Sequence, residues 1–240
     1  MSYVYGRNPV IEVLKTGKVD KLYVQKGNRE GSVKKIFGMA REGGILVTEV
    51  PKKKLDDYSE GNNHQGVVAL VSDYNYATLE EITELEHILI LDKIEDPHNF
   101  GAIARSAEAF GFKGILIPKH NAAYVNDVVY KTSAGAVENV RVAIVTNLSQ
   151  AVDTLKDKGF WIYAADMEGE AYTTVNLKGK VALVIGNEGK GISPALKKHT
   201  DVTVSIPMVG RINSLNASCA ASVLMAEVLR QYATAEVPSK

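Results

Sequence analysis

The amino-acid sequence predicts an α/β protein, in which a mostly parallel sheet follows a smaller α/β domain. Three observations support this prediction. The chain has 240 residues, enough for one or two domains at about 150 residues each. Short apolar segments alternate with longer amphipathic ones, as in successive βαβ units. The alternation stops between residues 72 and 86, where Tyr, Asn, Thr and glutamates replace most aliphatic side chains.

Each predicted element follows from the local pattern of apolar residues. Short apolar runs predict strands at 21–25, 45–50, 67–71, 87–92, 114–118, 140–145, 160–165, 181–185 and 202–206. The runs after residue 86 lack alternation, which is typical of strands buried on both faces of a parallel sheet. Apolar residues at helical spacing predict helices at 9–14, 33–41, 99–110, 148–158 and 214–232. We therefore expect two domains, 1–75 and 85–240, joined by a linker at 76–84.

The net charge of zero hides an uneven distribution of charged side chains. Residues 1–75 hold 12 Lys and Arg against 9 Asp and Glu, whereas residues 76–240 hold 16 against 19. The basic residues of the first part form two groups, which are Lys34, Lys35 and Arg41 in a predicted helix, and Lys52, Lys53 and Lys54 after Pro51. Both groups are candidates for binding RNA phosphates, although a run of charges often forms only a solvated face.

Several classes of function have no support in the sequence. The apolar runs are far shorter than the roughly 20 residues of a membrane span, and Met1 opens no signal segment, so we expect a cytoplasmic protein. The single cysteine, Cys219, lies among Ala and Ser and is expected to be buried. The chain contains neither a P-loop nor GxGxxG. No cluster of His and Cys has metal-ligand spacing, so no metal is expected.

A ligand site is expected beyond the C-terminal ends of the parallel strands. Three loops there are unusual, at 96–101, 186–191 and 207–216. In the first, Asn99 is a candidate N-cap of the next helix. The buried stripe of that helix leaves Arg105 exposed among small residues, where it could contact a phosphate or a partner. In the third, Ser214 is a candidate N-cap, and the free N–H groups beside it could also bind a ligand.

Taken together, DPHNFGAIAR (96–105), VIGNEGKGIS (184–193) and IPMVGRINSLNAS (206–218) resemble the three ordered motifs of the SpoU/TrmH family of RNA ribose 2′-O-methyltransferases, in the SPOUT superfamily. GRNPVIEVL (6–14) and HQGVVAL (64–70) resemble the substrate-binding domain of the RlmB type. That subgroup methylates a guanosine in the peptidyl-transferase region of 23S rRNA. The residues before the SLN triplet, 210–213, depart from the usual family pattern.

The resemblance implies a fold, a cofactor and site residues. The fold has a C-terminal trefoil knot and a front domain like that of a large-subunit ribosomal protein. The cofactor is S-adenosylmethionine, with contacts at Gly186, Ile206, Met208 and Leu215 and with residues 132–135 nearby. The implied catalytic residues are Asn99, Arg105, Glu188, Ser214 and Asn216. The resemblance also implies a homodimer, for which the small residues of 102–109 and 217–222 offer a contact face.

The reaction implied by the resemblance needs no metal and no covalent enzyme intermediate, because the methyl group passes from a sulfonium to a ribose oxygen in one displacement. Arg105 is either the general base or a residue that positions a phosphate. Ser214 and Asn216 could orient the ribose or the cofactor, and Glu188 could hold its loop or Arg105. Two other functions stay open: a tRNA ribose 2′-O-methyltransferase of the same family, and a non-catalytic rRNA-binding protein.

Overall fold

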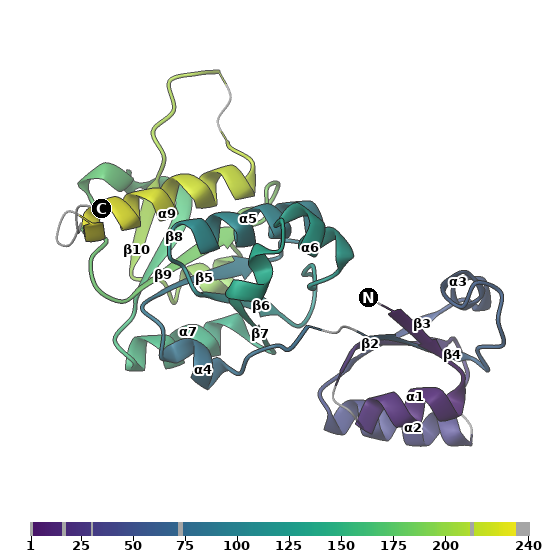
Figure 1. Ribbon diagram of the computed structural model, residues 1–240. Helices are drawn as coiled ribbons and strands as arrows, with labels where there is room; N and C mark the ends of the chain where they lie inside the picture. Colours follow the sequence, from purple (N-terminus) through teal and green to yellow (C-terminus); the bar gives the residue numbers. More distant parts are fainter. Residues whose placement is uncertain (1, 16–17, 30, 72–73, 212–213, 234–240) are drawn as a thin grey trace. The chain divides into compact units, whose positions relative to one another are not determined.

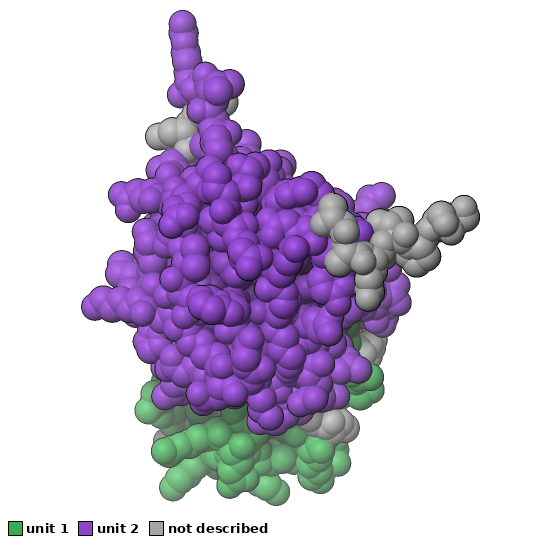
Figure 2. All heavy atoms as spheres, turned by 90° about the vertical axis from the view of Figure 1, so that its left-hand side faces the viewer, with its two compact units in different colours: residues 1–75 green, residues 76–240 purple. Residues whose placement is uncertain are grey.

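The computed structural model describes residues 2–15, 18–29, 31–71, 74–211 and 214–233. The chain divides into two compact units, Met1–Asn75 and Tyr76–Lys240, drawn in different colours in Figure 2. Each unit has its own sheet (Figure 1). Each also has its own hydrophobic core. The α/β class and the mostly parallel sheet that the sequence predicts are confirmed.

The first unit is a four-stranded sheet with helices on both faces (Figure 1). Its elements are β1 (Ser2–Tyr5), α1 (Arg7–Lys15), β2 (Val19–Gln25), α2 (Ser32–Glu42), β3 (Leu46–Val50), α3 (Lys52–Tyr58) and β4 (Val67–Val71). The strand order is β1-β4-β2-β3, and only β2 and β3 pair in parallel. Helices α1 and α2 pack on one face of the sheet around Leu22 and Ile36. Helix α3 packs on the other face, where Leu55 meets Tyr23 and Val68.

The second unit is a six-stranded sheet in which every pairing is parallel, in the order β10-β8-β9-β5-β6-β7. Figure 1 shows α5 and α9 over one face and α4 and α7 over the other. The elements are α4 (Leu79–Thr83), β5 (His87–Asp92), α5 (Pro97–Ala109), β6 (Gly114–Pro118), α6 (Asp127–Thr132), η1 (Ala136–Asn139), β7 (Arg141–Val145), α7 (Leu148–Asp157), β8 (Trp161–Ala171), η2 (Tyr172–Thr174), β9 (Val181–Gly186), α8 (Pro194–Lys197), β10 (Val202–Ser205) and α9 (Ala217–Ala233).

Residues 76–84, for which we expected a linker, belong structurally to the second unit. Ala77 forms a parallel bridge with Ala143. Thr78 and Glu81 form a reciprocal capping box, which starts the short helix α4. Ile82 on this helix is fully buried in the core of the second unit. Ala77 and Leu79 also pack against this core, so a polar stretch with a few aliphatic side chains is enough to fix these residues on the larger domain.

Strand β8 continues beyond the expected end at residue 165 as far as Ala171, and its last part pairs with β10 across an irregularity at Thr203 and Val204. Gly169 makes this pairing possible, because a Cβ on it would lie 2.5 Å from the carbonyl carbon of Thr203. The extension is polar and partly exposed, so apolar periodicity could not reveal it.

Candidate functional site

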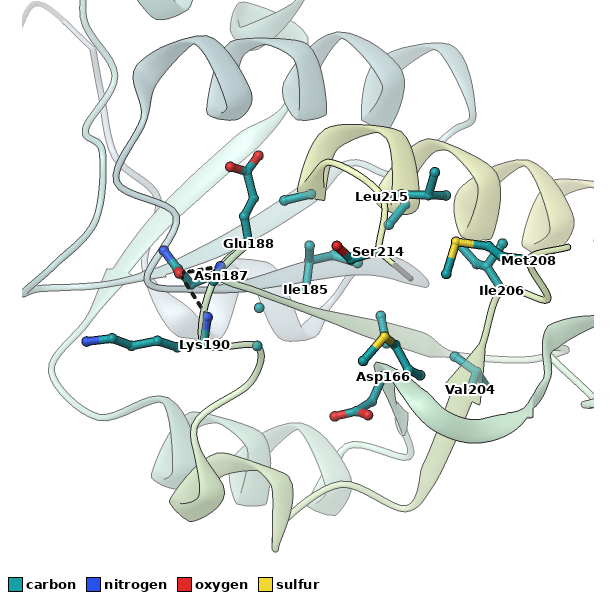
Figure 3. Close-up of a pocket in the computed structure, with 17 residues that line it drawn as sticks. Asp166, Ile185, Asn187, Glu188, Lys190, Val204, Ile206, Met208, Ser214 and Leu215 are labelled. Atoms are coloured by element: carbon teal, nitrogen blue, oxygen red, sulfur yellow. Dashed lines mark hydrogen bonds between the residues drawn. The ribbon is translucent and has the colours of Figure 1, made fainter. Parts of the chain in front are cut away.

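A pocket of about 350 Å³ lies at the C-terminal ends of β9 and β10 and beside the middle of β8 (Figure 3). Its wall is formed by residues 165–167 of β8, by the loop after β9 and by the segment that leads from β10 into α9. The structure brings together there all four residues expected to bind the cofactor, Gly186, Ile206, Met208 and Leu215. Asn187 and Glu188 lie at one side of the pocket, while Ile206 and Met208 border the opposite side (Figure 3).

The loop 186–191 is held in one conformation by Asn187. Its Oδ1 accepts hydrogen bonds from the backbone N–H groups of Gly189 (3.0 Å) and Lys190 (3.3 Å), drawn dashed in Figure 3. Its Nδ2 donates to the carbonyl of Lys93 (3.1 Å), just after β5. The loop folds back so closely that a Cβ on Gly186 would overlap the backbone of Gly191. A glycine at 186 is therefore a steric requirement of this pocket wall.

Three polar side chains from distant parts of the sequence meet beside the pocket. Nδ2 of Asn99 donates to Oε1 of Glu188 at 2.8 Å. Nδ2 of Asn216 donates both to Oδ1 of Asn99, at 2.9 Å, and to the same carboxylate oxygen of Glu188. We call Asn99, Glu188 and Asn216 the amide–carboxylate cluster. Glu188 also lines the pocket, so cluster and pocket share one residue.

The structure corrects two expected helix caps. Helix α5 begins at Pro97, and its cap is Asp96, whose carboxylate accepts from the N–H of His98 at 2.9 Å. Proline suits the first helical position, so the helix starts before Asn99 and leaves that side chain for Glu188. Helix α9 begins at Ala217, and Asn216 rather than Ser214 accepts from the N–H of Ser218 at 2.9 Å. Ser214 lies in the pocket wall instead.

Arg105 is exposed on α5, six residues after Asn99 and thus about 9 Å further along the helix. It does not line the pocket. Its neighbour Ser106 accepts a hydrogen bond from Ser222 on α9 at 2.8 Å, so α5 and α9 of one chain pack through small residues. The small residues of 102–109 and 217–222, expected to face a second copy of the chain, thus serve at least in part to join two helices of the same unit.

The structure locates three further sets of expected residues, and the expectation for one of them needs correction. Residues 132–135 are not among the residues that line the pocket, and Thr132 packs against Gly101 of α5. Cys219 is exposed, since the buried positions on that turn of α9 are Ala217 and Ala221. The two basic groups of the first unit are exposed on helices that cover opposite faces of the sheet, α2 for Lys34, Lys35 and Arg41 and α3 for Lys52, Lys53 and Lys54. They cannot form one continuous surface.

Comparison with known proteins gives the family. A model of the SpoU rRNA methylase family matches residues 86–226, and a model of the RNA 2′-O ribose methyltransferase substrate-binding domain matches residues 3–77. The chain belongs to the SpoU methylase family. Among its relatives, Bacillus subtilis YacO is assigned by name to the TrmH family of tRNA/rRNA methyltransferases. It is 42% identical over 238 residues, which cover 95% of each chain.

Solved structures of SpoU methylases agree with this assignment. An S-adenosylmethionine-bound rRNA methyltransferase from Sinorhizobium meliloti is 27% identical, with a TM-score of 0.60 over 95% of this chain and 87% of that one. The TrmH/SpoU tRNA-modifying enzyme of A. aeolicus is 28% identical, with a TM-score of 0.58 over 65% of this chain and 83% of that one. The front unit of this SpoU methylase is accordingly a substrate-binding domain.

Sequence reasoning assigned no role to Asp166, Asn187 and Lys190, although all three line the pocket. Asp166 accepts a hydrogen bond from Nζ of Lys197 at 2.9 Å. Desolvation raises the pKa of Asp166, but hydrogen bonds and the charge of Lys197 outweigh it and hold the pKa below its ordinary value. Asn187 lies between Gly186 and Glu188, two residues that the resemblance assigns to the site, and this position is the sequence signal that could have identified it.

No described helix is long and apolar enough to cross a membrane. The described residues also contain no group of three His, Cys, Asp or Glu that could hold a metal.

Proposed function

We propose that the protein methylates the ribose 2′-hydroxyl of a guanosine in the peptidyl-transferase region of 23S rRNA, with S-adenosylmethionine as methyl donor. The observation that carries this proposal is that Glu188 belongs both to the pocket and to the amide–carboxylate cluster. A methyl donor in the pocket and a ribose 2′-hydroxyl at the amide–carboxylate cluster would thus be held on either side of the loop 186–191.

The pocket residues fit S-adenosylmethionine. A volume of about 350 Å³ falls in the range of small-molecule sites, roughly 300–1,000 Å³. Ile185, Ile206 and Leu215 offer apolar contact for the adenine, and the carboxylate of Asp166 can pair with a cationic group. When bound, the cofactor supplies a methyl group on a positively charged sulfur.

The chain's own task is to orient the ribose and to remove a proton from its hydroxyl. In the proposed reaction a carbon–oxygen bond forms at the 2′ position while the carbon–sulfur bond breaks. Glu188 is the carboxylate shared by pocket and cluster, which makes it our candidate to accept the hydroxyl proton. Asn99 and Asn216 hold its Oε1 by hydrogen bonds, and Ser214, in the pocket wall, orients the ribose or the cofactor. We give Arg105 the role of phosphate positioner, because a guanidinium is not deprotonated in proteins.

Methylation of rRNA rather than tRNA is favoured by the front unit. The S. meliloti rRNA enzyme covers 95% of this chain, whereas the A. aeolicus tRNA enzyme covers 65%, close to the share of the second unit. We also propose, from the family resemblance, a trefoil knot in residues 85–240, a homodimer and a cytoplasmic location. Residues 212 and 213, part of the departure before the SLN triplet, lie outside the described residues.

The test is methyl transfer from labelled S-adenosylmethionine by the purified protein. Naked 23S rRNA, a large-subunit precursor particle and tRNA are offered in parallel. We expect label in rRNA, in one linkage that has become resistant to alkali, and none in DNA of the same sequence, which lacks the 2′-hydroxyl. Label on a base, or transfer to tRNA alone, would overturn the proposal.

A further inference from the structure

The sheet of the first unit presents a second face that α1 and α2 do not cover. Side chains alternate along a strand, so Tyr3 and Tyr5 on β1 point away from Val4, which packs in the core under α1 and α2. Helix α3 lies on this other face and packs there against Tyr23. We call Tyr3, Tyr5, Tyr23, Tyr58, Lys21 and Lys54 the tyrosine face.

Three rings of the tyrosine face, those of Tyr3, Tyr58 and Tyr23, form a stack in which the first pair is nearly parallel and the second is tilted by 43°. The ring of Tyr58 lies 4.8 Å from that of Tyr3, nearly parallel to it at 18°, and 4.6 Å from that of Tyr23. Tyr23 is buried at 8% exposure, whereas Tyr3 is 39% and Tyr5 36% exposed. The stack therefore begins in the core of the domain and ends in the exposed ring of Tyr3 on the edge strand.

Two lysines accompany the stack. Nζ of Lys21 lies 5.3 Å from the centre of the Tyr23 ring, and Nζ of Lys54 lies 5.9 Å from that of Tyr58. Neither lysine forms an ion pair with another of the residues that the structure describes. Burial, and then the positive charge of Lys54, lower the pKa of Lys21. Two cations that repel each other and form no such ion pair favour an anionic ligand.

We propose that the tyrosine face binds unpaired RNA, with a nucleobase stacked on the exposed Tyr3 and the backbone phosphates held by Lys21 and Lys54. This proposal rests on the proposed function and says which face of the substrate-binding domain meets the RNA. Exposed aromatic rings stack on bases that are splayed out of a helix, whereas bases in an A-form duplex are stacked on each other. Loops and bulges of rRNA are therefore the expected ligands, and the group on α2 lies on the other face of the sheet.

The test is the affinity of the full-length protein for a labelled single-stranded RNA of about ten nucleotides, measured by fluorescence anisotropy. Tyr3→Leu keeps an apolar side chain but removes the ring, and we expect it to weaken binding by about 5- to 100-fold. Tyr3→Phe keeps the ring and should bind as the wild type does. An abasic oligonucleotide keeps the phosphates and loses the bases, so it should bind weakly and equally to the wild type and to Tyr3→Leu. Trp161→Leu, at an exposed ring of the second unit, is the matched control and should not change the affinity.

The lysines are tested by salt dependence. Lys54→Gln should lower the slope of log Kd against log salt by about 0.7, as expected for one phosphate contact on a single strand. If Lys34→Gln on α2 lowers the slope and Lys54→Gln does not, the RNA lies on the other face of the sheet and the proposal is wrong. Equal affinity of Tyr3→Leu and wild type for the single strand also overturns it. Methyl transfer by the wild type is measured separately, so a failure of the proposed enzyme activity is distinguishable from a failure of the tyrosine face.

Discussion

Asn216 and Asn99, 117 positions apart in the sequence, are joined by a hydrogen bond of 2.9 Å from Nδ2 of Asn216 to Oδ1 of Asn99. The other end of the Asn216 side chain caps α9, because its Oδ1 accepts from the N–H and the hydroxyl of Ser218 at 2.9 and 2.6 Å. One side chain thus starts a helix and completes the amide–carboxylate cluster. The two roles use different atoms, so substitutions can separate them.

Asn216→Ser should preserve the helix and impair the reaction. Serine caps helices about as well as asparagine, but it lacks the amide that donates to Asn99 and Glu188. We expect the Tm to stay near that of the wild type and methyl transfer to fall about 100-fold, the scale for losing a positioning or acid–base group. Asn216→Ala loses the cap as well and should cost about 1 kcal/mol of stability. A variant Asn216→Ser with full activity would show that the cluster does not serve catalysis.

Arg105→Ala should lower methyl transfer by about 100-fold or more while the affinity for S-adenosylmethionine stays nearly constant. The cofactor affinity should stay constant because Arg105 is exposed on α5 and lies outside the pocket wall. Single-turnover rates and calorimetric cofactor binding measure the two quantities. Lys158→Ala, at an exposed cation after α7, is the control. Equal losses in cofactor affinity and in rate would instead assign Arg105 to the cofactor site or to folding.

Gly186→Ala and Gly189→Ala are a matched pair in one loop. A methyl group on Gly186 would overlap the backbone of Gly191, whereas one on Gly189 would meet only Oδ1 of Asn187 at an ordinary 3.6 Å. We expect Gly186→Ala to lose about 1–3 kcal/mol of stability, as overpacked sites do, and to bind S-adenosylmethionine weakly. Gly189→Ala should keep the stability of the wild type. Thermal melts measure the stability of each variant, and titration measures its affinity for S-adenosylmethionine. Similar stability of the two variants would contradict the steric argument.

The domain boundary predicts how the chain can be shortened. Residues 76–240 should fold and bind S-adenosylmethionine, lose most rRNA affinity and show a shallower salt slope. A chain that starts at Glu84 lacks α4 and the buried Ile82. It should be less stable by at least about 2 kcal/mol, the scale for one buried aliphatic side chain. Comparison of the two melting curves tests the boundary. If residues 76–240 methylate rRNA as well as the full chain, the first unit has a role other than rRNA affinity.

The sequence predicts the parallel sheet best, because strands buried on both faces are apolar throughout. Strands β5 and β6 begin and end at the predicted residues, 87–92 and 114–118. Strand β1 and helix α3 were missed. The first has only four residues, and the lysines of the second were interpreted only as a run of charges that could bind phosphates or form a solvated face. Their omission hid the tyrosine face, which depends on both.

The amide–carboxylate cluster shows the limit of reasoning from local pattern. Asn99 lies in the first turn of α5, Glu188 in the loop after β9 and Asn216 just before α9. Nothing in the periodicity of the chain places them together. Only the family resemblance grouped them. Local pattern also misassigned Asn99 as a cap, since Asp96 and Asn99 are both good capping residues and only the helical position of Pro97 decides between them.

The loop 186–191 is at once a wall of the pocket and the support of Glu188. A molecule that fills the pocket and an RNA that touches the cluster therefore act on the same few peptide bonds. In the proposed function their binding free energies are coupled through that loop, and thermodynamic linkage makes the coupling mutual. Whatever factor a bound S-adenosylmethionine applies to the affinity for RNA, bound RNA must apply to the affinity for S-adenosylmethionine. The same reciprocity holds for the two products of the transfer, so each must change the affinity for the other by one common factor.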